Sequence, residues 1–268
     1  MKLNIRISDT DICFAIYEAG NPPTFTFQPY HVKPQVSLMV NLRTAISQID
    51  MLQHTFEQVA VYVNAPVTPV PLTEFQEEDV DMLYKYCFSS SEKQRVFYDT
   101  VPASNAVLLF GLSENTCRTL EEAFGNVRYT AALTPVVQHF ARKSVMANET
   151  KRLFVYTHDG VIDVVVLDES RLVMLNTYSV QTLTDVDYYV FNMAKHLGVD
   201  VQGTPIFVAG IPMLREPVVS ELQKYANSVY SINPSGEFNR NVVSITEGVP
   251  YDLMCALLRK SQTVSITH

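Results

Sequence analysis

Three short strand-like runs lie near the start of the chain: residues 3–8 and 24–28 alternate apolar and polar residues, and residues 12–17 are apolar throughout. Polar Asp9-Thr10-Asp11 separates the first two runs, and the loop-forming segment 19–23 separates the next two. Apolar residues then recur at helical spacing over about 36–52, and a buried strand follows at 58–63. The pattern predicts an antiparallel meander, a covering helix and one further strand.

The same order returns after residue 150, again beginning with three strand-like runs: 152–156, 162–167 and 172–177. The next helix is expected to begin at a capping pair, Thr184 and Asp187, and to end at Gly198. The remaining expected elements are a strand at 205–209, a helix at about 213–226, a strand at 229–232 and a helix from Pro250 to about Lys260.

We interpret the two halves as duplicated β-β-β-α-β-α-β-α units, which gives an α/β fold of mixed sheets with helices on both faces. The predicted domains are 1–147 and 151–268, with a polar hinge at 147–151. The first carries a small β-β-α insertion at about 76–124. The alternative is that ordinary α/β alternation gives the same impression of a repeat.

This order resembles the actin-like ATPase superfold, a duplicated RNase H-like fold shared by actin, the Hsp70 nucleotide-binding domain, sugar kinases and the bacterial pilus-assembly ATPase. Segment 151–210 is more closely similar to an uncharacterised bacterial family assigned to that superfold. The likeness is carried by Leu175-Asn176-Thr177-Tyr178, Asp185 to Tyr189 and Phe207-Val208-Ala209-Gly210. The resemblance implies the fold and brings no established activity with it.

Glycine is scarce: only nine of 268 residues, and no two lie closer than five positions apart. The dinucleotide fingerprint G-x-G-x-x-G is therefore absent. Gly198 and Gly203 have P-loop spacing, but Thr204-Pro205 follows where a phosphate-binding lysine is needed.

Twenty basic and 28 acidic residues give a net charge of -8, which repels phosphate backbones and argues against a nucleic-acid partner. The longest apolar run, 106–112, is far shorter than a membrane span. Four scattered cysteines without C-x-x-C pairs are typical of a reduced protein. We therefore expect a cytoplasmic protein with no membrane span.

In active members of the superfold, an aspartate and a glycine-rich turn in the first hairpin hold phosphate. The matching turn here runs from Ser8 to Asp11 and contains no glycine. Asp9 and Asp11 would repel phosphate unless Mg²⁺ lay between them and the phosphate. The alternative is that both are ordinary turn residues whose side chains hydrogen-bond to their own backbone.

The second phosphate hairpin of the superfold matches 157–163. Asp159 and Asp163 are candidates to bind Mg²⁺ or to orient water, although Asp159-Gly160 is equally a standard hairpin signal. The base-contacting loop matches Ala209-Gly210-Ile211-Pro212, where Gly210 either accommodates a base or simply ends a strand.

The resemblance thus gives Asp9 and Asp159 as catalytic candidates, with Asp163 joining them as a candidate metal ligand. The candidate cofactor-binding residues are Asp9, Thr10, Asp11, Thr157, Asp159, Gly160 and Gly210. Because these sites are degenerate, we favour a non-hydrolysing adaptor for an unknown protein partner, a second copy of the chain included. The alternative is an assembly ATPase or small-molecule kinase that uses ATP and Mg²⁺.

Overall fold

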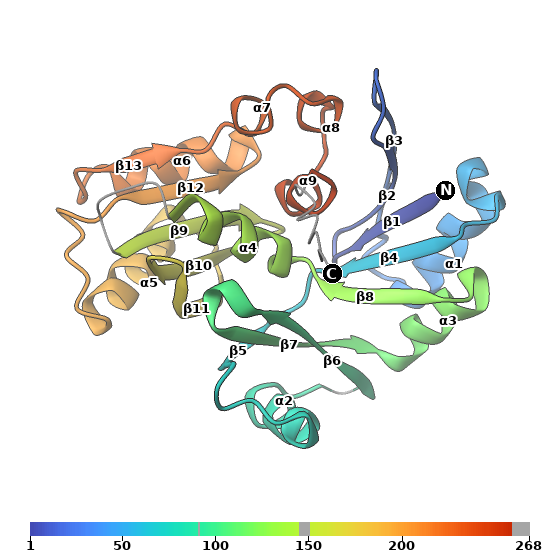
Figure 1. The fold of residues 1–268 in the computed structure, drawn as a ribbon, viewed down its shortest axis with the longest axis horizontal. Helices are drawn as coiled ribbons and strands as arrows, with labels where there is room; N and C mark the ends of the chain where they lie inside the picture. Colours follow the sequence, from blue (N-terminus) through green and yellow to red (C-terminus); the bar gives the residue numbers. More distant parts are fainter. Residues whose placement is uncertain (91, 145–150, 259–268) are drawn as a thin grey trace, which may run out of the picture.

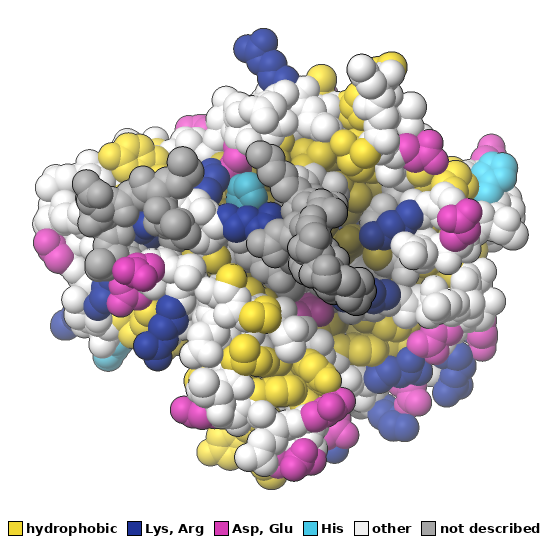
Figure 2. Space-filling model, viewed as in Figure 1, with side chains coloured by type: hydrophobic (Ala, Val, Ile, Leu, Met, Phe, Trp, Pro, Cys, Tyr) yellow, Lys and Arg dark blue, Asp and Glu magenta, His cyan; other side chains and the backbone are white. Residues whose placement is uncertain are grey.

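The computed structural model describes residues 1–90, 92–144 and 151–258. Most of the predicted hinge and the end of the last predicted helix lie outside these ranges. Two mixed sheets stand side by side, with a smaller sheet beneath them (Figure 1). Figure 2 shows basic and acidic side chains interspersed over the same face.

The first sheet has the order β3-β2-β1-β4-β8. Its strands are β1 Lys2–Ile7, β2 Asp11–Glu18, β3 Thr24–His31, β4 Gln58–Val63 and β8 Val127–Ala131. The first three are antiparallel, whereas β4 and β8 run parallel to β1. Two amphipathic helices, α1 Leu38–Gln48 and α3 Glu114–Phe124, cover one face of this sheet and bury its aliphatic side chains.

The second sheet repeats this order as β11-β10-β9-β12-β13. Its strands are β9 Lys151–His158, β10 Val161–Asp168, β11 Arg171–Ser179, β12 Ile206–Gly210 and β13 Val229–Ser231. Two helices, α5 Leu183–His196 and α6 Pro212–Leu222, cover its outer face. The shared strand order confirms the predicted duplicated α/β architecture.

The inner faces of the two sheets meet across α4 Leu133–Ser144 and α9 Tyr251–Leu257, which lie between them (Figure 1). Phe140 of α4 stacks on Phe154 of β9, with ring centroids 4.2 Å apart. One continuous core therefore includes side chains from both halves of the chain.

After β13 the chain crosses back to the first sheet through α7 Pro234–Glu237 and α8 Val242–Ile245, and then enters α9. We call residues 232–257 the crossover segment. Its buried side chains Val243, Val249 and Leu253 pack on Cys13 and Ala15 of β2. Among the described residues, no helix is long and apolar enough to cross a membrane.

The insertion contains a three-stranded sheet of order β5-β7-β6 and the helix α2. Its elements are β5 Thr68–Pro71, α2 Val80–Cys87, β6 Gln94–Val101 and β7 Ala106–Ser113. Three 3-10 turns complete the first half: η1 Asp50–Gln53, η2 Glu77–Asp79 and η3 Pro102–Ser104. The sequence pattern does not predict β5, because two of its four residues are proline; β5 is an edge strand, where proline is tolerated.

The predicted start of the long second-half helix was wrong by two residues. The helix begins at Leu183, and its cap is formed by Thr182 with Asp185 instead of Thr184 with Asp187. The Asp185 carboxylate accepts hydrogen bonds from the backbone N–H groups of Gln181 and Thr182. These contacts satisfy donors that a helix start otherwise leaves free.

Candidate functional site

The two predicted phosphate hairpins meet where the central strands β1 and β9 end. The first turn, residues 8–10, joins β1 to β2, with Ile7 paired to Ile12. The second turn is Asp159-Gly160, and both residues have positive φ, 44° and 75°. Val161 pairs with His158 across it, so the Asp-Gly dipeptide forms the two-residue hairpin that it predicts.

The Asp159 carboxylate joins the two halves of the protein. Its Oδ2 accepts a hydrogen bond from Arg6 Nη2 of β1 at 2.6 Å and another from Asn64 Nδ2 at 2.8 Å. Its Oδ1 accepts one from the Thr10 hydroxyl at 2.5 Å, and the Ser8 hydroxyl lies 3.2 Å away. The first turn therefore contacts Asp159 through hydroxyl groups.

Arg6 is also bound from the crossover segment. Its Nε lies 2.9 and 2.8 Å from the two carboxylate oxygens of Asp252 in α9, and both side chains are about 2% exposed. Burial opposes the charge of the guanidinium, but Asp252 and Asp159 outweigh it and raise the pKa of Arg6. One arginine thus holds carboxylates from two distant parts of the chain.

His158 lies between the Asp159 carboxylate and a further one, that of Asp163. Its Nε2 donates to Asp163 Oδ2 at 2.6 Å, and its Nδ1 lies 3.1 Å from Asp159 Oδ2. Asp163 also accepts a hydrogen bond from the Thr177 hydroxyl at 2.6 Å. Burial lowers the pKa of His158, but Asp163 and Asp159 outweigh this effect and raise it to about 9, so the ring is an imidazolium at neutral pH.

We call these side chains the interhalf network: Arg6, Thr10, Asn64, His158, Asp159, Asp163, Thr177 and Asp252. It contains two cations and three carboxylates. Burial raises the pKa of Asp159, but hydrogen bonds from His158 and the charge of Arg6 outweigh burial and hold that pKa well below its ordinary value. The network is therefore close to neutral and has no surplus positive charge.

The donor set does not fit a Mg²⁺ site at Asp159. Five donors, from Arg6, Asn64, Ser8, Thr10 and His158, surround the two oxygens of the carboxylate, and two of these donors are cations. In the described ranges no cluster of three or more His, Cys, Asp or Glu side chains is placed to hold a metal ion. A metal at Asp159 would have to displace the guanidinium.

The remaining candidates from the sequence are dispersed around the network. Asp9 is exposed, and within the described residues its side chain forms no hydrogen bond or ion pair. Asp11 pairs with His31 on the neighbouring strand. Thr157 is buried and donates to the Ala209 carbonyl at 3.3 Å.

Gly210 ends β12 at a position that excludes a side chain. Its φ is 136°, and an added Cβ would lie 2.2 Å from Thr157 Oγ1 and 2.6 Å from the Thr157 carbonyl oxygen. Pairing of Gly210 with Thr157 in the parallel ladder accounts for this glycine without a bound base.

Five network residues were not among the candidates: Arg6, Asn64, His158, Thr177 and Asp252. Arg6 alternates with apolar neighbours in β1, which is the pattern of a solvent-facing position. The crossover segment covers that face instead, and the sequence spacing between residues 6 and 252 gives no indication of it. His158 was detectable, because it directly precedes the Asp159-Gly160 turn.

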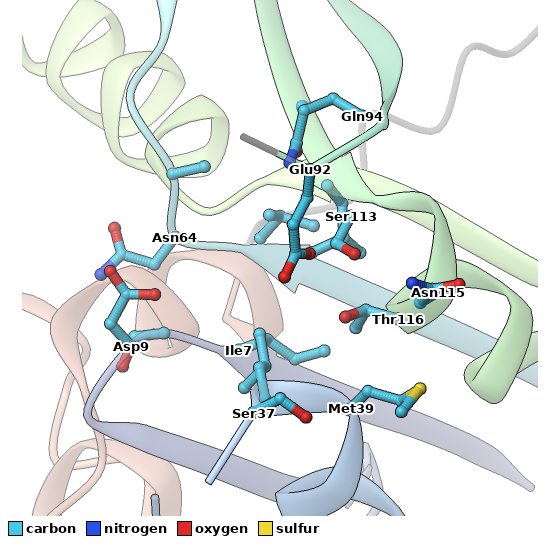
Figure 3. A pocket seen from close by; sticks show the side chains of 16 residues that line it. Ile7, Asp9, Ser37, Met39, Asn64, Glu92, Gln94, Ser113, Asn115 and Thr116 are labelled. Atoms are coloured by element: carbon cyan, nitrogen blue, oxygen red, sulfur yellow. The ribbon is translucent and has the colours of Figure 1, made fainter. Parts of the chain in front are cut away.

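Cavities flank the network. A cavity of about 560 Å³, which we call the Phe27 cavity, lies between β3, the end of β9, the start of α6 and residues 246–251. A second, of about 580 Å³, lies between Asp9, the segment 64–69 and Thr177. A third, of about 350 Å³, lies within the first half (Figure 3); Asp9 and Asn64 are at one end of it, and Glu92 and Ser113 of the insertion face them.

The repeated sheets, with their hairpins facing each other, define the actin-like ATPase fold. A Bacteroides thetaiotaomicron protein with an actin-like ATPase fold and unknown function matches at a TM-score of 0.83 and 23% identity, over 97% of this chain and 96% of that one. The PilM-PilN type IV pilus biogenesis complex matches at a TM-score of 0.57 and 12% identity, over 96% and 97%.

The chain belongs to the family DUF3822, described as proteins of unknown function, whose pattern matches residues 1–229. No curated protein matches the sequence. Family and fold therefore agree with the resemblance seen in the sequence, and neither supplies an activity.

Proposed function

We propose that this protein is an adaptor of actin-like fold that joins protein partners and does not hydrolyse ATP. The observation that carries the proposal is the bond between Arg6 and Asp159, which occupies the meeting point of the two hairpins. In a nucleotide-hydrolysing member this position has to receive phosphate and its metal ion.

Electrostatics supports the proposal. A triphosphate would bring several negative charges next to the carboxylates of Asp159, Asp163 and Asp252. The two cations of the network balance only part of the negative charge that these three carboxylates already carry. Freeing Arg6 for phosphate would leave buried carboxylates without a partner, which costs about 3–5 kcal/mol. The first turn offers Asp9 in place of glycine, so it adds repulsion where backbone amides would be needed.

Two features support a role in protein assembly. PilM, whose fold is similar, is found in a complex with PilN. The net charge of -8 also disfavours a nucleic-acid partner, which leaves a protein as the favoured kind of macromolecular partner. We place the protein in the cytoplasm, where its four unpaired cysteines would stay reduced.

The test is a melting series of the full chain with Mg-ATP, Mg-ADP and AMP. A ligand at one hundred times its dissociation constant adds about 2.7 kcal/mol, which is several degrees in melting temperature. We expect no shift at millimolar nucleotide, with an active actin-like ATPase as the positive control. A shift with Mg-ATP that Asp159→Asn abolishes would overturn the adaptor proposal in favour of an ATPase or kinase.

A further inference from the structure

The Phe27 cavity has the size and lining of a binding site. Its volume of about 560 Å³ falls within the range of ligand pockets, about 300–1,000 Å³. Its walls are mainly aromatic and aliphatic, and they come from both halves: Phe27, Pro29, Tyr156, Ile211, Leu214 and Pro250. Because both halves contribute walls, a group bound here would contact both halves of the protein.

Exposed apolar side chains either line this cavity or directly neighbour its lining residues in the chain. Ile211 and Leu214 line it and are 44% and 39% exposed, while Met213 between them is 81% exposed. Ile245, which precedes the lining residue Thr246, is 60% exposed. We call these four the aliphatic rim. Exposed apolar groups that gather beside a cavity mark a site of protein contact, whereas isolated ones do not.

The charges at the cavity determine what it can accept. Its two buried cations are already bound by carboxylates: Arg6 by Asp252 and Asp159, and His158 by Asp163 and Asp159. Glu247 lines the opening, is exposed, and has no hydrogen-bond or ion-pair partner among the described residues. Asp11 adds a second carboxylate, shared with His31. The opening therefore repels anions and attracts a basic group.

We propose that the Phe27 cavity and the aliphatic rim bind a partner protein through a short segment that combines a large apolar side chain with a lysine or arginine. The apolar side chain enters the cavity against Phe27 and Leu214, and the basic group lies at the opening beside Glu247. Complementary charge fixes the orientation of the segment, and burial of apolar area supplies most of the affinity. This inference rests on the proposed adaptor function and adds the chemistry of the partner.

The experiment is a selection of random 12-residue peptides on the immobilised full-length protein. Enriched peptides are then measured by fluorescence anisotropy against the wild type, Met213→Asp and Glu247→Lys. Met82→Asp is the matched control, because Met82 is 62% exposed on α2 in the insertion. Both methionines are exposed, so circular dichroism should report folded protein for each variant.

We expect enriched peptides to pair an aromatic or aliphatic residue with lysine or arginine. Met213→Asp should weaken their binding about tenfold or more, Glu247→Lys should weaken it and reduce its salt dependence, and Met82→Asp should leave it unchanged. Peptides that bind Met213→Asp as tightly as the wild type, acidic consensus sequences, or no enrichment at all would each overturn the inference. None of these results depends on Mg-ATP, so the adaptor proposal would still stand or fall by the melting series.

Discussion

Replacing Arg6 with methionine tests the interhalf network directly. The variant keeps most of the side-chain volume but removes the cation that faces Asp252, about 2% exposed, and Asp159, 15% exposed. Removing one partner of a buried ion pair costs about 3–5 kcal/mol, because the remaining charge is left without compensation. We expect the free energy of unfolding in urea at pH 7 to fall by about 4 kcal/mol.

Arg43→Met provides the matched control. Arg43 is 57% exposed, and its ion pair with Glu122 spans 3.8 Å at the surface. Exposed pairs contribute about 0–1 kcal/mol, so this variant should unfold close to the wild type. A second condition makes the test sharper. Lowering the pH from 7 to 5 should reduce the loss in free energy of unfolding that Arg6→Met causes, because protonation of the buried carboxyl groups in the variant removes their uncompensated charge.

The wild type should behave differently over the same interval. The lowered pKa of Asp159 means that its stabilising contribution is present above about pH 4 and is lost only as the pH falls through that lowered value. An Arg6→Met variant that loses less than 1 kcal/mol at pH 7, or no more than Arg43→Met, would refute the view that this network holds the halves together.

Three further predictions concern single positions. Gly210→Ala should lower the free energy of unfolding by about 3 kcal/mol or more in urea, because its Cβ would collide with the Thr157 backbone; an unchanged midpoint would contradict this. Burial and Glu221 raise the pKa of Asp187 to about 6, so the stability that its protonated form provides is lost as the pH rises through 6. Asp187→Asn should therefore stabilise the protein by about 1 kcal/mol at pH 7 and by nothing at pH 4. The raised pKa of His158, about 9, predicts that the free energy of unfolding falls between about pH 6.5 and 9, and that His158→Gln flattens this slope.

The architecture could be predicted from the sequence because it depends on periodicity. The short strand-like runs of β1–β3 and β9–β11, the helical spacing in α1 and α5, and the Asp159-Gly160 turn are local signals. The strand β5 escaped prediction because Pro69 and Pro71 oppose strand formation, and only an edge position next to β7 makes them acceptable.

The candidate site could be predicted only in part, for a different reason. Alignment with the superfold pointed to Asp159 and Thr10, which the structure brings together. The pairing of Arg6 with Asp252 could not be predicted from the sequence. It depends on which face of β1 the helix α9 covers, and only the three-dimensional structure gives this. The local sequence pattern indicates that β1 has one polar face. It does not indicate whether the Arg6 guanidinium on that face donates its hydrogen bonds to water or to a carboxylate 246 positions away.

The ion pair between Arg6 and Asp252 also affects how the chain is made. During synthesis, Asp252 emerges only 246 residues after its partner Arg6. A nascent or truncated chain that lacks α9 can form β1, but Arg6 would lack the Asp252 carboxylate, and Cys13 and Ala15 would lose part of the apolar cover that the crossover segment provides. The first sheet therefore gains this ion pair and part of its cover only when the last described helix arrives, so an incomplete translation product would expose that face to proteases and chaperones.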